Sequence, residues 1–166
     1  MRALLLPLLL MPLQAAAAES TPQAAVAALW RASSNAPGGS ADSATLRRLF
    51  HPEAVVFGGR YKDGQPALKR SSGEAFLKNF EQPSDKGFYE CEVVRTVHTY
   101  DRFATAYSVV ESRADPTAAK PDFVGVNSVQ LYREGDQWRV LSLYYHVEKP
   151  GLAIDLGGGQ PGKCLE

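Results

Sequence analysis

Few side chains in this sequence could do chemistry near neutral pH. Its 166 residues include three histidines, at positions 51, 98 and 146, and none has the spacing of a metal-binding motif such as His-Glu-x-x-His. The Gly-x-Ser-x-Gly motif of one class of hydrolase is also missing. A histidine that shares a pocket with a glutamate or a tyrosine can still transfer protons, since histidine titrates near pH 7. His146 with Tyr144 or Glu111 is therefore the candidate catalytic set, and we expect no metal and no cofactor.

Each of these candidates also has a purely structural explanation. A histidine near the end of a strand commonly makes hydrogen bonds that only support the fold, and Glu111 can pair with Arg113 in solvent. His98 follows Glu90 and Glu92 at the same strand parity, which is typical of a solvent-facing row. We therefore favour a role without catalysis and keep the enzyme as the alternative.

The candidate residues lie in a half of the chain that has the pattern of a strand meander. The sequence predicts long strands at 88–100, 102–113, 123–133 and 137–149, and the short turns between the first and last pairs make those neighbours antiparallel. Both parities of the last strand are largely apolar, so both faces of the sheet should be covered. If the parity of Trp138 faces inward, the residues lining a pocket are Trp138, Ser142, Tyr144 and His146, with Tyr107, Glu111 and Asn127 from the neighbouring strands.

Three helices should precede this sheet. Thr21-Pro22 is a typical helix start, and Val26, Leu29 and Trp30 follow at helical spacing. A second helix is predicted at 43–50 with Asp42 as its cap, and a third at 72–80 behind a capping box formed by Ser71 and Glu74. A short strand at 53–57 should stop at Gly58-Gly59, before a hairpin around Asp63-Gly64. Helices followed by a meander predict an α+β fold.

The N-terminus predicts export. Residues 1–18 combine Arg2, an apolar run and a small-residue end, which together make a signal peptide, and the run is shorter than the roughly 20 residues of a spanning helix. We expect a periplasmic or secreted domain at 19–150 and a tail at 151–166. Eighteen basic residues face eighteen acidic ones, so we expect no nucleic-acid partner and no membrane insertion after cleavage.

The only two cysteines are Cys91, in the first long strand, and Cys164, near the C-terminus. In an oxidising compartment two cysteines usually pair. The sequence therefore predicts a disulfide that holds the tail against the sheet.

Two short stretches resemble the nuclear transport factor 2-like (NTF2-like) superfamily, the cystatin-like cone fold that includes SnoaL-like domains. They are Leu-Phe-His-Pro-Glu-Ala-Val-Val-Phe at 49–57 and Gly-Asp-Gln-Trp-Arg-Val-Leu at 135–141. The resemblance implies an exported bacterial member in which three N-terminal helices pack in the concavity of a strongly curved, mostly antiparallel sheet. It also implies a pocket at the open end and a homodimer formed through the outer sheet face. The ketosteroid isomerase branch has its catalytic aspartate where this chain has Gly58, so that mechanism is not expected.

The leading hypothesis is an exported domain that binds a small apolar or aromatic molecule in the cone. Its predicted ligand-binding residues are Trp30, Phe76, Tyr107, Asn127, Trp138, Ser142, Tyr144 and His146. The enzymatic alternative is a cofactor-independent SnoaL-like lyase, isomerase or cyclase that uses His146 with Tyr144 or Glu111. A third hypothesis is a protein-interaction module that uses the outer face of the sheet.

Overall fold

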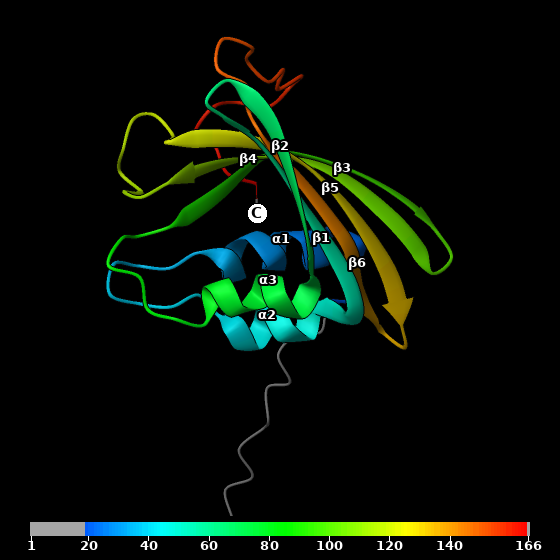
Figure 1. Ribbon diagram of the computed structural model, residues 1–166. Helices are drawn as coiled ribbons and strands as arrows, with labels where there is room; N and C mark the ends of the chain where they lie inside the picture. The colour runs from blue at the N-terminus through cyan, green and yellow to red at the C-terminus, as the bar shows by residue number, and fades with distance from the viewer. Residues whose placement is uncertain (1–18, 166) are drawn as a thin grey trace, which may run out of the picture.

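The computed structural model describes residues 19–165, in which a curved sheet arches over three helices (Figure 1). The predicted signal peptide lies outside the described residues and stays a prediction. The strand order is β2-β1-β6-β5-β4-β3, with β1 and β6 parallel and all other neighbours antiparallel. The elements are α1 (Pro22–Ser33), α2 (Ser43–Leu49), β1 (Phe50–Lys62), β2 (Gln65–Ser72), α3 (Gly73–Leu77), the 3₁₀ helix η1 (Lys78–Phe80), β3 (Tyr89–Tyr100), β4 (Phe103–Arg113), β5 (Phe123–Glu134) and β6 (Gln137–Val147). This confirms the α+β prediction.

The helices begin where short polar side chains satisfy their first amides. Thr21 accepts a hydrogen bond from the Ala24 amide at 3.1 Å, and Asp42 accepts one from the Thr45 amide at 2.9 Å, as the sequence predicts. The third cap is Ser72, which accepts from the Ala75 amide at 3.2 Å. The predicted cap at Ser71 is wrong by one residue, because β2 continues through Ser72 and α3 begins only at Gly73.

The prediction that Gly58-Gly59 ends the first strand is also wrong. Both glycines lie inside β1, where they pair with Tyr145 and His146 of β6. A Cβ atom at Gly58 would overlap the Tyr145 hydroxyl, and one at Gly59 would overlap the His146 imidazole. The absence of side chains at these glycines therefore leaves room for Tyr145 and His146 of β6 to lie across β1. The chain turns only at Asp63-Gly64, both at positive φ, as the predicted hairpin requires.

A bulge in β6 changes which of its side chains face the helices. Leu131 pairs with Val140 and Gln130 with Ser142, so Leu141 has no partner opposite it. Trp138 and Val140 are buried before the bulge, and Leu143 is buried after it. The prediction that the Trp138 parity continues inward is therefore wrong for Ser142 and Tyr144, which face outward.

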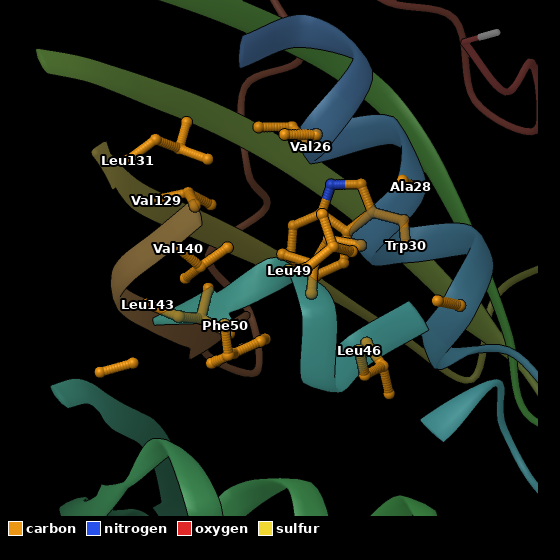
Figure 2. Close-up of a cluster of buried hydrophobic side chains, with 14 of the residues drawn as sticks. Val26, Ala28, Trp30, Leu46, Leu49, Phe50, Val129, Leu131, Val140 and Leu143 are labelled. Carbon is orange, nitrogen blue, oxygen red and sulfur yellow. The ribbon is translucent and has the colours of Figure 1, made fainter. Parts of the chain in front are cut away.

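The core fills the space between α1, α2 and the concave face of the sheet. Figure 2 shows Val26, Leu46 and Leu49 of the helices in one cluster with Val140 and Leu143 of β6. Packing of these side chains fixes α1 across the sheet, so that its C-terminal turn lies beside the start of β3. Among residues 19–165, no helix has the length and hydropathy to cross a membrane.

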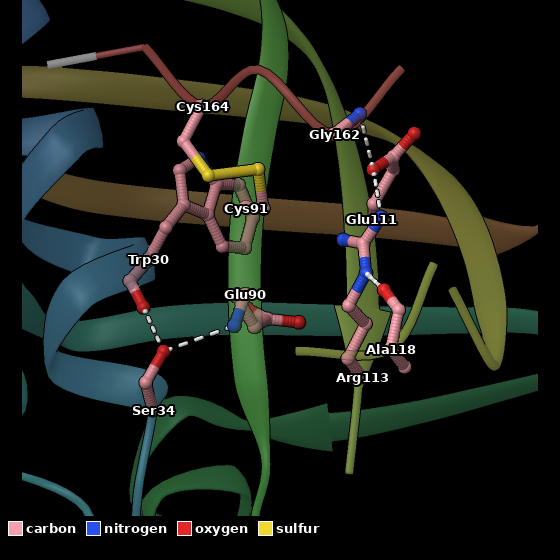
Figure 3. Close-up of a disulfide and its surroundings, with 9 residues drawn as sticks. All are labelled: Trp30, Ser34, Glu90, Cys91, Glu111, Arg113, Ala118, Gly162 and Cys164. Atoms are coloured by element: carbon pink, nitrogen blue, oxygen red, sulfur yellow. Dashed lines mark hydrogen bonds and ion pairs between the residues drawn. A yellow bond between two sulfur atoms is a disulfide. The ribbon is translucent and has the colours of Figure 1, made fainter. Parts of the chain in front are cut away.

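The predicted Cys91–Cys164 disulfide is present and holds the C-terminal tail on the outer face of the sheet (Figure 3). Ile154 and Leu156 pack against a second apolar cluster, and the Leu165 amide donates to the Glu92 carbonyl at 2.7 Å. The cluster consists of Cys91, Val93 and Val109. The chain thus covers part of its own outer face, where the resemblance implied a second subunit.

Candidate functional site

A cavity of about 560 Å³ opens between the helices and one end of the sheet. Its sheet wall combines the starts of β3 and β5 with the ends of β4, β6 and β1, which the antiparallel pairs and the parallel β1–β6 pair bring to the same end of the sheet. Its helix wall comes from α1, α3 and η1. The lining is mainly apolar and rich in aromatic rings, including Trp30, Phe76, Phe80, Phe88 and Phe123. Such a hollow has the size and character of a small-molecule site.

Glu90 is the acidic side chain on the β3 side of this cavity. It lies opposite Ser112 of β4, whose hydroxyl donates to the Glu90 carboxylate at 3.2 Å. Its backbone amide donates to the Ser34 hydroxyl at 3.0 Å, and Ser34 donates in turn to the Trp30 carbonyl at 3.0 Å (Figure 3). Two hydrogen bonds therefore tie the start of β3 to the end of α1 and hold Glu90 at the cavity wall.

Desolvation raises the pKa of Glu90 to about 7, although the hydrogen bond from Ser112 acts in the opposite direction. Some of the side-chain surface remains open to the cavity, so a ligand can reach it. No lysine, arginine or histidine of residues 19–165 forms an ion pair with Glu90. At neutral pH the carboxyl group therefore exists in both forms and can donate or accept a proton.

Asn127 places a second polar group in the cavity wall. Its amide nitrogen donates to the Ser108 carbonyl at 3.4 Å and to the Gly125 carbonyl at 3.3 Å. These two bonds occupy the donors of the side chain. The carboxamide oxygen is left as an acceptor for a ligand.

Glu90 is not among the predicted site residues, because strand parity places Glu90, Glu92 and His98 in one solvent-facing row. That prediction is wrong for both glutamates. A register shift at Val93 separates them from His98, which is exposed and pairs with Thr105. Glu92 is buried and already satisfied, since it accepts from Ser108 at 2.6 Å and from Arg95 at 2.8 Å. Glu90 has no such cationic partner, which makes it the chemically available acid.

The structure brings four of the predicted ligand-binding residues to the cavity: Trp30, Phe76, Asn127 and His146. Tyr107 and Tyr144 are instead 46% and 42% exposed on the outer face. Trp138 is buried in the core, and Ser142 donates to Gln130 at 2.9 Å. A binding role for the four cavity residues stays a prediction.

The predicted catalytic set is not assembled in the cavity. The Tyr144 hydroxyl and His146 Nδ1 are 3.0 Å apart, but both side chains lie on the outer side of β6, and the His146 ring packs edge-on against Tyr61. Glu111 lies two strands away, under the tail, where it is paired with Arg113 at 2.6 Å and accepts from the Gly162 amide at 2.9 Å. His146 thus contributes to the cavity rim beside Tyr61, away from Glu111.

In residues 19–165, no three His, Cys, Asp or Glu side chains are grouped to hold a metal ion. Glu90 is the acid–base group on the β3 side of the cavity, with Ser112, Asn127 and Tyr145 as hydrogen-bonding groups nearby, while His146 and Glu148 lie at the rim.

The sequence matches no protein-family model and no curated protein. Solved structures do resemble it. An NTF2-like protein of unknown function from Shewanella baltica OS155 matches with a TM-score of 0.53 and 18% identity, over 76% of this chain and 92% of that one. A second, from Silicibacter pomeroyi DSS-3, matches with a TM-score of 0.51 and 19% identity over the same shares. A candidate ketosteroid isomerase from Parabacteroides distasonis ATCC 8503 matches with a TM-score of 0.51 and 14% identity, over 78% of this chain and 89% of that one. With the curved sheet closing over three helices, these similarities show that the chain has the NTF2-like fold.

Proposed function

We propose that this protein binds a small, largely apolar molecule in the cone cavity. The observation that carries the proposal is a hollow of about 560 Å³ whose aromatic walls surround a carboxyl group and a carboxamide oxygen. Cavities with apolar walls and a few fixed polar groups are the usual form of small-molecule sites, because the walls supply affinity and the polar groups supply orientation. In this cavity Glu90 and Asn127 would orient the ligand.

The expected affinity is moderate. An aromatic probe with about 17 non-hydrogen atoms gains roughly 0.3 kcal/mol for each, which gives about 5 kcal/mol and a Kd of the order of 0.1 mM. Trp30 lines the cavity, so its fluorescence should respond to occupancy.

Two matched variants test this site with the uncharged fluorescent probe N-phenyl-1-naphthylamine. Gly125→Ile adds a side chain at the cavity wall, where a Cβ atom makes only an ordinary contact with the His146 carbonyl, at 3.4 Å. Ser128→Ile adds the same side chain to the same strand on the exposed outer face. We expect the wild type and Ser128→Ile to bind the probe and Gly125→Ile to lose it. No binding by the wild type, or equal binding by both variants, would refute the cavity as the site.

The raised pKa of Glu90 favours a second function, in which a cofactor-independent lyase or isomerase uses Glu90 as its base. The carboxylate would take a proton from the carbon beside a carbonyl group, the electron pair would move onto the carbonyl oxygen, and the proton would return to carbon. In D₂O this cycle exchanges the α-protons of an apolar ketone such as 4-phenyl-2-butanone, which NMR measures directly. Exchange by the wild type and none by Glu90→Gln would support it, while no exchange above background would refute it for this ketone class.

A further inference from the structure

We infer that the cone cavity selects organic cations, apolar molecules that carry a protonated amine, with the Glu90 carboxylate as their counter-ion. This inference rests on the proposed binding function and adds the charge of the ligand. Its basis is the Glu90 carboxyl group on the β3 side of an aromatic cavity, where no cationic side chain of residues 19–165 is paired with it.

Two arginines on β3 and β4, the strands that carry Glu90 and Ser112, are already paired with other acids. Arg95 is paired with Glu92 at 2.8 Å, and Arg113, adjacent in sequence to Ser112, is directed at Glu111 at 2.6 Å. Both partners are glutamates, so neither arginine can neutralise Glu90 without leaving a buried charge unpaired.

Charged side chains at the cavity rim do not neutralise the negative charge of Glu90 either. Its other charged or titratable lining residues all come from β1, from β6 or from the segment that follows β6. They are Arg60, Tyr61, Tyr145, His146 and Glu148. Arg60 is exposed and lies on β1, four strands from β3 in the sheet order. The helix wall contributes no charged side chain to the lining. An ionised Glu90 therefore makes its side of the cavity negative, which attracts a cation and repels an anion.

The aromatic walls favour the same ligand charge. Phe88 and Phe123 are stacked with their centroids 6.4 Å apart, next to the strand ends that carry Glu90 and Ser112. Phe76 and Phe80 contact edge-to-face at 5.1 Å on the helix wall. Aromatic ring faces attract cations, and a carboxylate within an aromatic enclosure is a suitable site for an ammonium group on an apolar body.

Three phenyl compounds of similar size separate ligand charge from ligand shape. Isothermal titration at pH 8.5 should show 2-phenylethylamine binding at least tenfold more tightly than 2-phenylethanol, and no binding of 3-phenylpropionate. At pH 5.5 only about 3% of Glu90 is ionised with its pKa of about 7, so the amine should lose most of its preference over the alcohol, at most about 30-fold in affinity relative to pH 8.5. The affinity for the alcohol should stay the same.

Two isosteric variants identify which carboxylate causes the preference for the amine. Glu90→Gln keeps the hydrogen bond from Ser112 and should remove the preference for the amine while leaving the alcohol bound. Glu148→Gln, at the rim, should retain the preference, since the Glu148 carboxylate is already engaged by the Ile154 amide at 3.0 Å. Loss of the preference in Glu148→Gln but not in Glu90→Gln would overturn the assignment.

The proposed function and this inference fail differently. If the uncharged probe and the alcohol bind but the amine binds no more tightly, the cavity is a ligand site and the charge selection is refuted. If none of these compounds binds, the binding function itself is refuted. Tighter binding of 3-phenylpropionate than of the amine would overturn the inference and point to Arg60 at the rim.

Discussion

Replacing Glu90 by glutamine should stabilise the folded protein at pH 8.5 and leave its stability nearly unchanged at pH 4. The pKa of Glu90 is about 7 in the fold, against an ordinary value of 4.5. The folded state therefore holds this proton more tightly than the unfolded state does. Between pH 4.5 and 7, unfolding releases the proton, so the wild type becomes less stable as the pH rises. Glutamine does not titrate and avoids this loss.

The size of the effect follows from the same two values. Their difference, at about 1.4 kcal/mol for each tenfold change in proton affinity, corresponds to an upper limit of roughly 3–4 kcal/mol. Water in the open cavity screens the charge, so we expect about 2 kcal/mol. For a domain of this size such a gain raises Tm by roughly 4–8 °C.

Urea unfolding measured by tryptophan fluorescence at the two pH values checks this, because Trp30 and Trp138 are both buried. Glu53→Gln, at an exposed position of β1, controls for the loss of one negative charge. An equal change in the unfolding free energy of Glu90→Gln at pH 4 and pH 8.5, or a loss of stability at pH 8.5, would refute a raised pKa of Glu90 in the fold.

Three further changes test other parts of the structure. Cys164→Ser opens a loop whose ends are 73 residues apart, and it should reduce the unfolding free energy by about 4 kcal/mol in urea unfolding; an unchanged midpoint would show that the tail adds no stability. Gly58→Ala displaces the Tyr145 ring, so it should lower the unfolding free energy by roughly 1–3 kcal/mol in the same assay and weaken probe binding. An unchanged unfolding free energy would contradict the close approach of the Tyr145 ring to Gly58. Tyr107→Glu with Tyr144→Glu places two charges on the exposed outer face and should convert the predicted homodimer to monomer in sedimentation velocity. A wild type that already sediments as a monomer would disprove that dimer.

Much of the fold could be predicted from local chemistry. Thr21 and Asp42 fix two helix starts because each side chain can accept from an amide three residues ahead. The turns at Asp63-Gly64 and Gly135 follow from residues that tolerate positive φ. The pairing within the disulfide could also be predicted, because a chain with two cysteines allows only one intramolecular pair.

The site could not be predicted as well, because its residues depend on strand parity and two bulges reverse it. The shift at Val93 separates the inward Glu90 from the outward His98, and the shift at Leu141 turns Tyr144 outward and Tyr145 inward. A bulge inserts one unpaired residue, and no residue type marks either position in this sequence. A shift of one residue moves every later side chain of the strand to the opposite face of the sheet. Faces assigned by counting alternate residues are therefore wrong beyond each bulge.

The two bulges have a common consequence for the cavity. Without the shift at Leu141, Tyr144 and His146 would face the helices with Trp138, and Tyr145 would leave the wall that it now forms beside Asn127. Without the shift at Val93, Arg95 would leave the inward face that it shares with Glu92, and that glutamate would become a second unpaired acid near Glu90. The observed registers leave Glu90 in the cavity wall without a cationic partner, whereas Glu148 at the rim accepts a hydrogen bond from the Ile154 amide. The uncompensated charge of Glu90 is the reason to test the ligand's charge together with its shape.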